Sequence, residues 1–355
     1  MKKPFESEER TGLALQSLYE KYGYQPYKMR KFEEYDLYAG NKSFLISENV
    51  LTFTDPGGKL MALKPDVTLS VVRSCRQGEE KKICYGEKVY RPGRDGSFKE
   101  ITQVGVENVG KIDLYAVCEV LSLALSSLLF IAGDARLCIS DTRLFSFFAD
   151  KATSNAALRE ELKNAFTAKN REEILSFAKR GCDGRMLDRL AALSSLDGAP
   201  CEVFPSLYKL SKDRAYVAAV KELQTLAEVL DSPAVFIDAS VTGDLDYYGG
   251  VIFRGYIPGV GESVLSGGQY DPLMRKMGKN QSALGFAVCL DSLPPAAPAK
   301  YDADLLILYG EDSDPGTVLR EVKKETARGK TVYAARTAPA GFTAKSVLDL
   351  KAKED

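Results

Sequence analysis

Two strand-like segments of this chain, 82–92 and 100–110, are separated only by a short polar loop from Gly93 to Ser97. So short a connection brings the second strand back along the first, which predicts an antiparallel hairpin. Further strand-like runs lie at 43–47, 50–55, 135–141, 234–241, 245–257 and 261–266. Because these runs do not alternate regularly with helices, the sequence predicts an α+β fold with an antiparallel sheet flanked by helices, not a doubly wound nucleotide-binding fold.

Helical periodicity fills much of the remaining sequence. The expected helices are 8–22, 67–75, 114–132 and Ala283–Leu293. Between about 145 and 232 the chain is rich in Ala, Leu, Lys and Glu, which predicts a helical insertion into the sheet domain. Within this insertion Asn170 and Glu173 have the spacing of a capping box, and Gly181 is placed to end the helix.

The C-terminal part of the sequence is set off by the segment PPAAPAK at 294–300, which is typical of a linker. Beyond it a strand-like run, a helical run at about 314–329 and a second strand-like run form one βαβ pattern. The sequence therefore predicts a large domain at 1–295 and a small C-terminal βαβ domain at 300–355.

Composition excludes several classes of function. The chain has no histidine, and its 48 basic side chains nearly balance its 49 acidic ones. The missing histidine excludes Ser-His-Asp triads, Cys-His pairs and histidine-based zinc sites, and the balanced charge speaks against binding nucleic acid by bulk phosphate neutralisation. The 7 cysteines are odd in number and include no Cys-x-x-Cys pair. We expect a reducing compartment, no disulfide framework, no bound metal and no cofactor.

Two features bear on the location of the protein. The opening MKKPFESEER is polar and lacks an apolar region, so we expect no secretory signal. The apolar stretch at 120–133 contains serines and is shorter than the roughly 18 residues of a membrane span, so we expect a core helix. The sequence predicts a cytoplasmic protein that does not enter the membrane.

One strand carries the first candidate site. Because side chains alternate in a strand, Gln103, Gly105 and Glu107 share one face, while Val104 and Val106 share the other. The amide and the carboxylate lie about 13 Å apart along the strand, and the glycine between them leaves the surface open. These side chains could hold both ends of a small polar molecule, or they could be solvated on a half-exposed strand.

Three more segments combine polar groups with glycine or proline. They are Lys64–Thr68 with Asp66, Leu245–Phe253 with Tyr247 and Tyr248, and Ser266–Asp271 with Tyr270. Each has an ordinary interpretation when taken alone: helix capping, aromatic packing and a tight turn. If LDYYGGVIF is a continuous strand, Tyr247 and Tyr248 face opposite sides.

Taken in order, these segments resemble a known family. The series KPDVT, VYRPGRDGSFKEITQVGVE, LDYYGGVIF, SGGQYD and ALGFAVCLDSL is similar to the catalytic domain of class II histidyl-tRNA synthetases. Order, spacing and the helical insertion before LDYY all match, over roughly residues 10–293. The resemblance implies a class II aminoacyl-tRNA synthetase-like antiparallel sheet flanked by helices.

The chain departs from this family where a synthetase holds ATP. The arginine two residues before the LDYY leucine is replaced by Gly243, and the arginine of the third motif is replaced by Ser292. The second motif keeps Arg91, which would face the amino acid's carboxylate, but has Gly93 in place of its glutamate. The proline of the first motif is Arg30. Because a triphosphate needs cations to hold it, these losses predict that adenylation is absent.

The residues that the family uses for its amino acid are retained. The histidine-binding set implied by the resemblance is Asp66, Thr68, Arg91, Gln103, Glu107, Tyr247, Tyr248 and Tyr270. In this set Asp66, Thr68 and Gln103 would hold the α-amino group, and Glu107 and Tyr248 would hold the imidazole. A site that keeps its amino-acid ligands and loses its nucleotide ligands is typical of a sensor.

This combination is similar to the regulatory subunits of ATP phosphoribosyltransferase in histidine biosynthesis, which also carry Asp in the KPDVT segment. The resemblance implies a non-catalytic, allosteric subunit that binds L-histidine for feedback inhibition and activates a short-form catalytic ATP phosphoribosyltransferase subunit. It also implies a homodimer within a hetero-oligomer, while the small βαβ tail speaks against tRNA binding. Two alternatives stay open: a diverged histidyl-tRNA synthetase or free-standing histidine-activating enzyme, and a histidine sensor that acts on another partner.

Overall fold

The computed structural model describes residues 5–39, 50–92, 97–294 and 301–351. Two units can be distinguished, one of residues 10–294 and one of residues 1–9 and 295–355. The expected strand at 43–47, most of the hairpin loop with Gly93, and the Pro- and Ala-rich segment after Pro294 lie outside the described residues.

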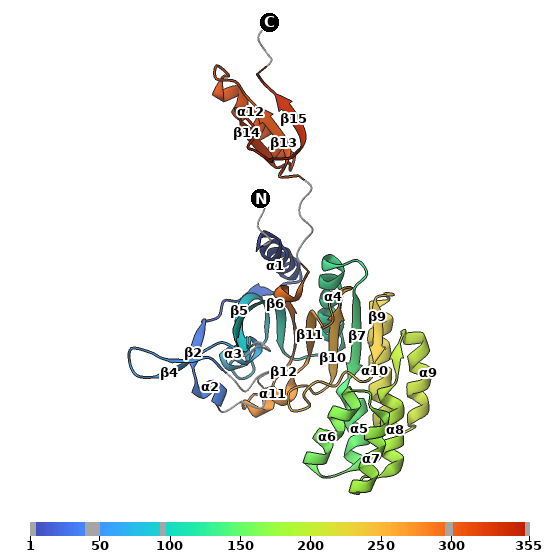
Figure 1. Ribbon diagram of the computed structural model, residues 1–355. Coiled ribbons are helices and arrows are strands. Elements are labelled where there is room, and N and C mark those ends of the chain that lie inside the picture. Colours follow the sequence, from blue (N-terminus) through green and yellow to red (C-terminus); the bar gives the residue numbers. More distant parts are fainter. Residues whose placement is uncertain (1–4, 40–49, 93–96, 295–300, 352–355) are drawn as a thin grey trace. The chain divides into compact units, whose positions relative to one another are not determined.

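The larger unit is built on one wide sheet (Figure 1). Among the described residues this sheet has nine strands in the order β1-β5-β6-β12-β11-β10-β7-β9-β8. Their bounds are β1 Gln25–Pro26, β5 Lys81–Pro92, β6 Phe98–Gly110, β7 Arg136–Asp141, β8 Asp197–Gly198, β9 Val235–Asp238, β10 Val251–Tyr256, β11 Leu265–Gln269 and β12 Ser282–Cys289. The pairs from β5 to β7 are antiparallel, whereas β1–β5 and β7–β9 are parallel. The expected antiparallel sheet is confirmed.

The predicted hairpin is formed by β5 and β6, which pair from Lys81 opposite Val109 to Pro92 opposite Phe98. Side chains alternate along β6 as expected. Val104 and Val106 are buried in the main hydrophobic core, and Gln103 and Glu107 lie on the other face of the strand. The alternation therefore separates the residues that stabilise the sheet from those available for a site.

The segment expected to be the helix Ala283–Leu293 is instead strand β12 followed by a short 3-10 helix, Leu290–Ser292. The prediction was wrong because β12 lies between β6 and β11, where consecutive residues from Ala283 to Phe286 are all buried. A strand covered on both faces is a continuous apolar run, which periodicity cannot distinguish from a buried helix.

Two further expectations are corrected. Residues 245–248 form a turn, in which the backbone N–H groups of Tyr247 and Tyr248 both donate to the carbonyl of Asp244, at 3.1 and 2.7 Å. The regular alternation expected for the two tyrosines therefore does not apply. Conversely, the glycines expected in a tight turn belong to strand β11, where a Cβ on Gly267 would lie 2.4 Å from the carbonyl oxygen of Gly285. These glycines permit close strand contact.

Helices cover the sheet and form the insertion. They are α1 Phe5–Glu20, α2 Asp36–Ala39, α3 Thr68–Ser74, α4 Leu114–Ile131, α5 Thr142–Ala152, α6 Ala156–Thr167, α7 Arg171–Ser176, α8 Gly184–Ser194, α9 Pro200–Leu210, α10 Arg214–Leu230 and α11 Asp271–Lys276, with a 3-10 helix at Phe177–Arg180. By length and composition α4 could cross a membrane, but 56% of it is buried and it packs into the main hydrophobic core. Helix α4 is therefore part of the core.

The predicted helical insertion corresponds to α5–α10, which follow β7 and gather at one side of the sheet in Figure 1. The side chain of Asn170 caps α7 by accepting from the N–H of Glu173 at 3.2 Å, and its amide donates to the carboxylate of Glu173 at 2.9 Å. Gly181 ends the next turn with a left-handed φ of 87°. The predicted cap and stop are both confirmed.

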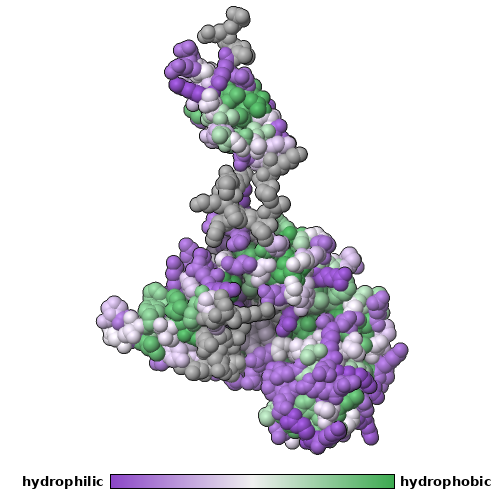
Figure 2. Space-filling model, viewed as in Figure 1, coloured by the Kyte–Doolittle hydropathy of each residue, from purple (hydrophilic) through white to green (hydrophobic). Residues whose placement is uncertain are grey.

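A small antiparallel sheet lies apart from the large one, in the order β2-β4-β3. Its strands are β2 Phe32–Glu34, β3 Thr52–Thr54 and β4 Leu60–Leu63. Figure 2 shows hydrophobic residues gathered over this part of the chain, where Phe32, Phe53 and Leu60 are exposed. The rings of Phe32 and Phe53 pack edge to face with centroids 5.5 Å apart, so the two exposed rings partly cover each other.

The C-terminal part contains the expected βαβ unit and one more strand. Its elements are β13 Ala303–Leu308, α12 Pro315–Ala327, β14 Val332–Ala335 and β15 Ala344–Asp349. The strands are parallel in the order β14-β13-β15. The sequence did not indicate β15 because it is a largely exposed edge strand without an alternating apolar pattern.

The close contact of β6 with β12 gives a stability prediction. A Cβ on Gly105 would lie 2.0 Å from the carbonyl oxygen of Phe286 and 2.7 Å from the hydroxyl of Tyr85. Because backbone cannot withdraw as a flexible side chain can, Gly105→Ala should lower the free energy of unfolding by roughly 1–3 kcal/mol, measured in urea. The control Gly184→Ala, with no atom within 4 Å of its Cβ, should be neutral or stabilising. Equal effects of both would contradict the close contact.

Candidate functional site

The candidate site is a pocket of about 450 Å³ on the face of the large sheet that carries Gln103 and Glu107. Its walls come from β5, β6, the start of α3, the turn at 243–248 and strands β10–β12. The structure brings the complete predicted set to this pocket: Asp66, Thr68, Arg91, Gln103, Glu107, Tyr247, Tyr248 and Tyr270. These residues are spread over more than 200 positions of the sequence, so only the sheet topology brings them together.

Glu107 forms the buried end of the pocket, with 1% of its surface exposed. The hydroxyl of Thr68 donates to its Oε1 at 2.8 Å, and the hydroxyl of Tyr270 donates to its Oε2 at 2.7 Å. Gly285 lies directly against the carboxyl group, since a Cβ there would be 1.8 Å from Oε2. Three elements, β6, α3 and the segment before α11, therefore meet at one carboxyl group.

Burial raises the pKa of Glu107 to about 8. The hydrogen bonds from Tyr270 and Thr68 partly offset this rise, because they favour the charged form, and the nearby charge of Asp66 adds to it. A carboxyl group that titrates near neutral pH can accept a hydrogen bond from a cationic or neutral N–H group of a ligand.

The start of α3 provides a second, half-buried group of polar atoms. Asp66 caps the helix by accepting from the N–H of Leu69 at 3.0 Å, which fixes its carboxylate at the pocket wall. Arg91 donates from Nε to the carbonyl of Pro65 at 2.8 Å, and its terminal nitrogen lies 3.5 Å from Asp66. Arg91 therefore already forms an ion pair with a carboxylate of the protein itself.

Gln103 and Tyr85 complete the floor next to Glu107. The side-chain amide of Gln103 donates to the sulfur of Cys289 at 3.6 Å, and the hydroxyl of Tyr85 donates to the carbonyl of Phe286 at 3.4 Å. Gly105 pairs with Tyr85 across the two strands, and Tyr85 would contact any larger side chain at this position. The glycine that the sequence suggested as an open floor is thus covered by an aromatic ring.

Three tyrosines line one wall of the pocket. The rings of Tyr247 and Tyr248 have centroids 4.6 Å apart, and those of Tyr247 and Tyr270 are 6.0 Å apart. Burial raises the pKa of each hydroxyl well above the ordinary value for tyrosine, so all three are neutral donors at physiological pH. The turn at 245–248, and not a strand, directs both members of the pair toward the same cavity.

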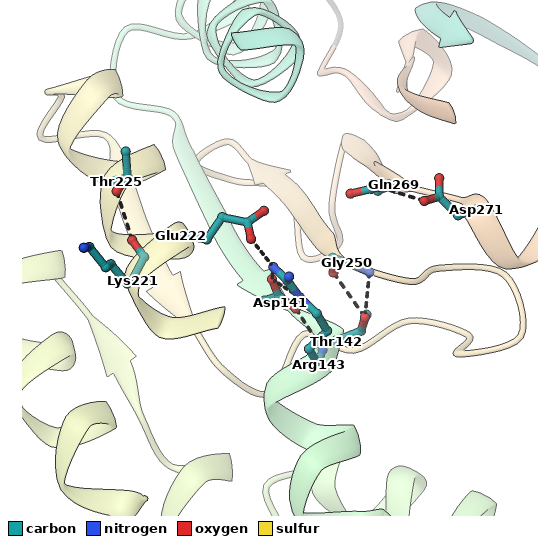
Figure 3. A network of polar contacts seen from close by, with 9 residues as sticks. All are labelled: Asp141, Thr142, Arg143, Lys221, Glu222, Thr225, Gly250, Gln269 and Asp271. Atoms are coloured by element: carbon teal, nitrogen blue, oxygen red, sulfur yellow. Dashed lines mark hydrogen bonds and ion pairs between the residues drawn. The ribbon is translucent and has the colours of Figure 1, made fainter. Parts of the chain in front are cut away.

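A polar network holds this tyrosine turn in place (Figure 3). Thr142, the first residue of α5, accepts from the N–H of Gly250 at 2.9 Å and donates to the carbonyl of Gly250 at 3.2 Å. Its own N–H also donates to that carbonyl, at 3.0 Å. On the other side the N–H of Gly249 donates to the carbonyl of Gln269 at 2.9 Å. The two glycines that follow the tyrosine pair are therefore fixed by hydrogen bonds to α5 and β11.

The same network extends to the helical insertion. Arg143 binds both carboxylate oxygens of the buried Asp141 through Nε, at 2.9 and 3.0 Å, and also pairs with Glu222 of α10 at 2.9 Å. Figure 3 shows Arg143 between these two acids, next to the threonine that holds Gly250. The junction between β7 and α5 thus joins the insertion to the loop that lines the pocket.

The sequence patterns did not single out two charged residues of the pocket lining, Asp244 and Arg254. Arg254 follows Ile252 by two positions on β10, so alternation along the strand expected at 245–257 could have placed both on one face. Gly243 also lines the pocket, whereas Ser292 lies in the 3-10 helix after β12 and Arg30 is exposed on another segment. The arrangement offers hydrogen-bond donors, acceptors and charges for a small zwitterion.

Comparison with known proteins agrees with this arrangement. The histidyl-tRNA synthetase family model matches residues 3–293. The ATP phosphoribosyltransferase regulatory subunit of Clostridium kluyveri is 28% identical over 320 residues, which cover 84% of this chain and 82% of the relative.

Two solved structures share the fold. One is an ATP phosphoribosyltransferase regulatory subunit/histidyl-tRNA synthetase from Bacillus halodurans C, with TM-score 0.75, 21% identity and coverage of 99% of this chain and 95% of that one. The other is a chain of the ATP phosphoribosyl transferase (HisG:HisZ) complex from Thermotoga maritima, with TM-score 0.63, 20% identity and coverage of 80% and 97%. The expected class II aminoacyl-tRNA synthetase-like fold is confirmed.

The raised pKa of Glu107 predicts a pH-dependent stability. The unfolded carboxyl ionises near its ordinary pKa of 4.5 and the folded one near 8. Between these values the folded state binds more protons, so stability falls as pH rises, by at most about 1.4 kcal/mol per pH unit. Glu107→Gln cannot ionise, so the variant does not lose stability in this way. The free energy of unfolding of the variant minus that of the unmodified protein, measured in urea, should therefore rise from pH 5 to 8.

The matched control for this experiment is Glu100→Gln on the same strand. Glu100 is exposed, and its hydrogen bond from Lys88 lowers its pKa. It is therefore ionised throughout this pH range in both folded and unfolded protein, and its replacement should not change the slope. A stability difference for Glu107→Gln that stays flat from pH 5 to 8 would show that this carboxyl is not titrating there.

Proposed function

Since this chain belongs to the histidyl-tRNA synthetase family, we propose that it binds free L-histidine without activating it, as the regulatory subunit of ATP phosphoribosyltransferase in the first step of histidine biosynthesis. In this role it activates a short-form catalytic subunit and transmits feedback inhibition by histidine. It works in the cytoplasm as a homodimer within a hetero-oligomer. The name of the Clostridium kluyveri relative supports the role, and the Thermotoga maritima complex supports partnership with a second chain.

The observation that carries this proposal is the buried carboxyl of Glu107 at the end of a small polar pocket. An imidazole N–H can donate to this group, whereas an apolar side chain would leave it without a ligand partner. In the proposed complex Tyr248 lies at the imidazole with Glu107, and Asp66, Thr68 and Gln103 hold the α-amino group. The cavity of about 450 Å³ is within the range of small-molecule sites.

The nucleotide side of the pocket supports a role other than adenylation. Gly243, at the position of a synthetase arginine, has φ +61°, and a Cβ there would lie 2.5 Å from Ile252 and 2.9 Å from Tyr248. Backbone and neighbours both disfavour a side chain at this position. Ser292 replaces the other arginine with a short neutral side chain. Both arginines that would hold ATP are thus replaced, and the backbone at position 243 favours glycine.

The alternative function is a diverged histidyl-tRNA synthetase or a free-standing histidine-activating enzyme. The retention of Arg91 in the pocket is the observation that favours it, since this guanidinium belongs to the second motif of the synthetases. It differs from the regulatory role in one measurable respect, which is the formation of histidyl-adenylate from ATP and histidine.

ATP–pyrophosphate exchange distinguishes the two functions. Histidine-dependent exchange by the purified chain should be undetectable in an assay in which an authentic histidyl-tRNA synthetase is active. Gly243→Arg should not restore exchange, because Ser292 leaves the triphosphate without its second cation and the new side chain would clash with Ile252. Measurable exchange by the unmodified chain would contradict the regulatory function.

Reconstitution tests the regulatory role directly. The short-form catalytic subunit should gain activity on mixing with this chain, and histidine should then inhibit the mixture. Feedback requires that histidine bind two states of the assembly with different affinity, and coupling with the partner's substrates should be reciprocal, typically about 5–150-fold. Glu107→Ala should weaken histidine binding about tenfold or more in calorimetry, because it removes a buried hydrogen-bond partner of the ligand.

A conservative pair of variants separates activation from feedback. Tyr248→Phe removes one hydroxyl from the pocket and should weaken feedback, while activation, which depends on the assembly surface, stays largely intact. Tyr115→Phe removes a hydroxyl from the exposed side of α4, outside the pocket, and should leave histidine inhibition unchanged. Loss of activation and feedback together in Tyr248→Phe would mean that pocket and assembly surface are not separable.

A further inference from the structure

The pocket contains a second guanidinium group, that of Arg254, at a position that neither the sequence motifs nor the resemblance singled out. Arg254 lies on β10 opposite Ser266 of β11, and both residues line the pocket. The side chain is half-buried. Among the described residues it donates no hydrogen bond and forms no ion pair.

The other charged groups of the pocket are already satisfied by the protein. Arg91 is bound by the carbonyl of Pro65 and by Asp66. Asp244 accepts the N–H of Asp246 at 2.8 Å and caps the tyrosine turn. A half-buried cation without a partner is unfavourable, because it has lost part of its hydration without gaining an anion. Arg254 is therefore the group of the pocket with unused capacity to bind an anion.

Arg254 is also close to the residues assigned to the ligand. Burial raises the pKa of Tyr248, and the positive charges of Arg254 and Arg91 partly offset that rise, so both guanidinium groups lie near the same hydroxyl. Glu107, by contrast, is almost fully buried, whereas Arg254 is only half-buried. A ligand with a proton-donating ring at Glu107 and an anionic group at its other end matches this distribution of charge.

We propose that Arg254 binds the α-carboxylate of the amino-acid ligand, an inference that rests on the proposed function and names one more contact of the same site. A guanidinium presents parallel N–H donors that match both oxygens of a carboxylate. Arg91 shares its charge with Asp66, so Arg254 provides the uncompensated positive charge. The ammonium group of the ligand stays with Asp66, Thr68 and Gln103, as in the proposed function.

The shape of the loop explains why this cation comes from β10. At position 243 the left-handed backbone and the contact with Ile252 disfavour a side chain. Ile252 and Arg254 are two apart on β10 and so share a face of the sheet. The strand therefore places an arginine at the pocket wall, whereas the adjoining loop disfavours one at position 243. Arg254 is in this way a specificity-determining residue for ligands with a carboxylate.

Calorimetry with two ligands tests this assignment. Histidine and histamine share the imidazole and the ammonium group, and only histidine has the carboxylate. Arg254→Gln should weaken histidine binding about tenfold or more, as expected for loss of a charged hydrogen-bond partner, and should leave the weaker histamine binding unchanged. Arg254→Lys should retain part of the histidine affinity, because it keeps the charge but loses the paired donors.

The control Arg136→Gln removes the same charge from an exposed position at the start of β7, outside the pocket, and should not alter histidine affinity. Unchanged histidine binding by Arg254→Gln would overturn the assignment, and so would an equal loss for histidine and histamine. Arg254-dependent binding of inorganic phosphate with unchanged histidine binding would assign the guanidinium to a phosphate and also overturn it. If the unmodified chain binds neither ligand, the proposed function itself fails, and this inference fails with it.

Discussion

The site depends on one buried carboxyl group packed against a glycine. Glu107 on β6 lies directly over Gly285 on β12, and its two oxygens are held by Thr68 and Tyr270. Burial of a carboxyl group is unfavourable unless donors surround it. The fold meets that requirement with a helix start on one side and the residue before a short helix on the other. The resulting pKa near 8 makes this end of the pocket responsive to the charge and donors of a ligand.

A second constraint fixes the opposite wall of the pocket. The tyrosine turn is tied to the sheet through Gly250, which Thr142 holds on both its N–H and its carbonyl. The neighbouring Arg143 joins this point to Glu222 in the helical insertion. Hydrogen bonds and an ion pair therefore connect the insertion to the loop that carries Tyr247 and Tyr248.

Much of the fold could be predicted because its signals are local. The β5–β6 hairpin, helix α4 and the cap at Asn170 each follow from spacing within a short segment. Strand β12 could not be recognised, because its apolar run has no period that separates a doubly covered strand from a buried helix. The turn at Tyr247 and Tyr248 was missed for a related reason: its geometry is set by the carbonyl of Asp244 and by Thr142, which is distant in sequence.

The sequence by itself determined the alternation on β6 that separates Gln103 and Glu107 from the core valines, and it determined which polar residues the chain has for a site. Only the tertiary structure decided how those residues meet. It placed Thr68 and Tyr270 on the same carboxyl group, paired Arg91 with Asp66, and left Arg254 on the pocket wall without a partner among the described residues. The physical reason is that side-chain direction follows from local backbone geometry, whereas partners, burial and pKa depend on strand order and on segments far apart in the chain.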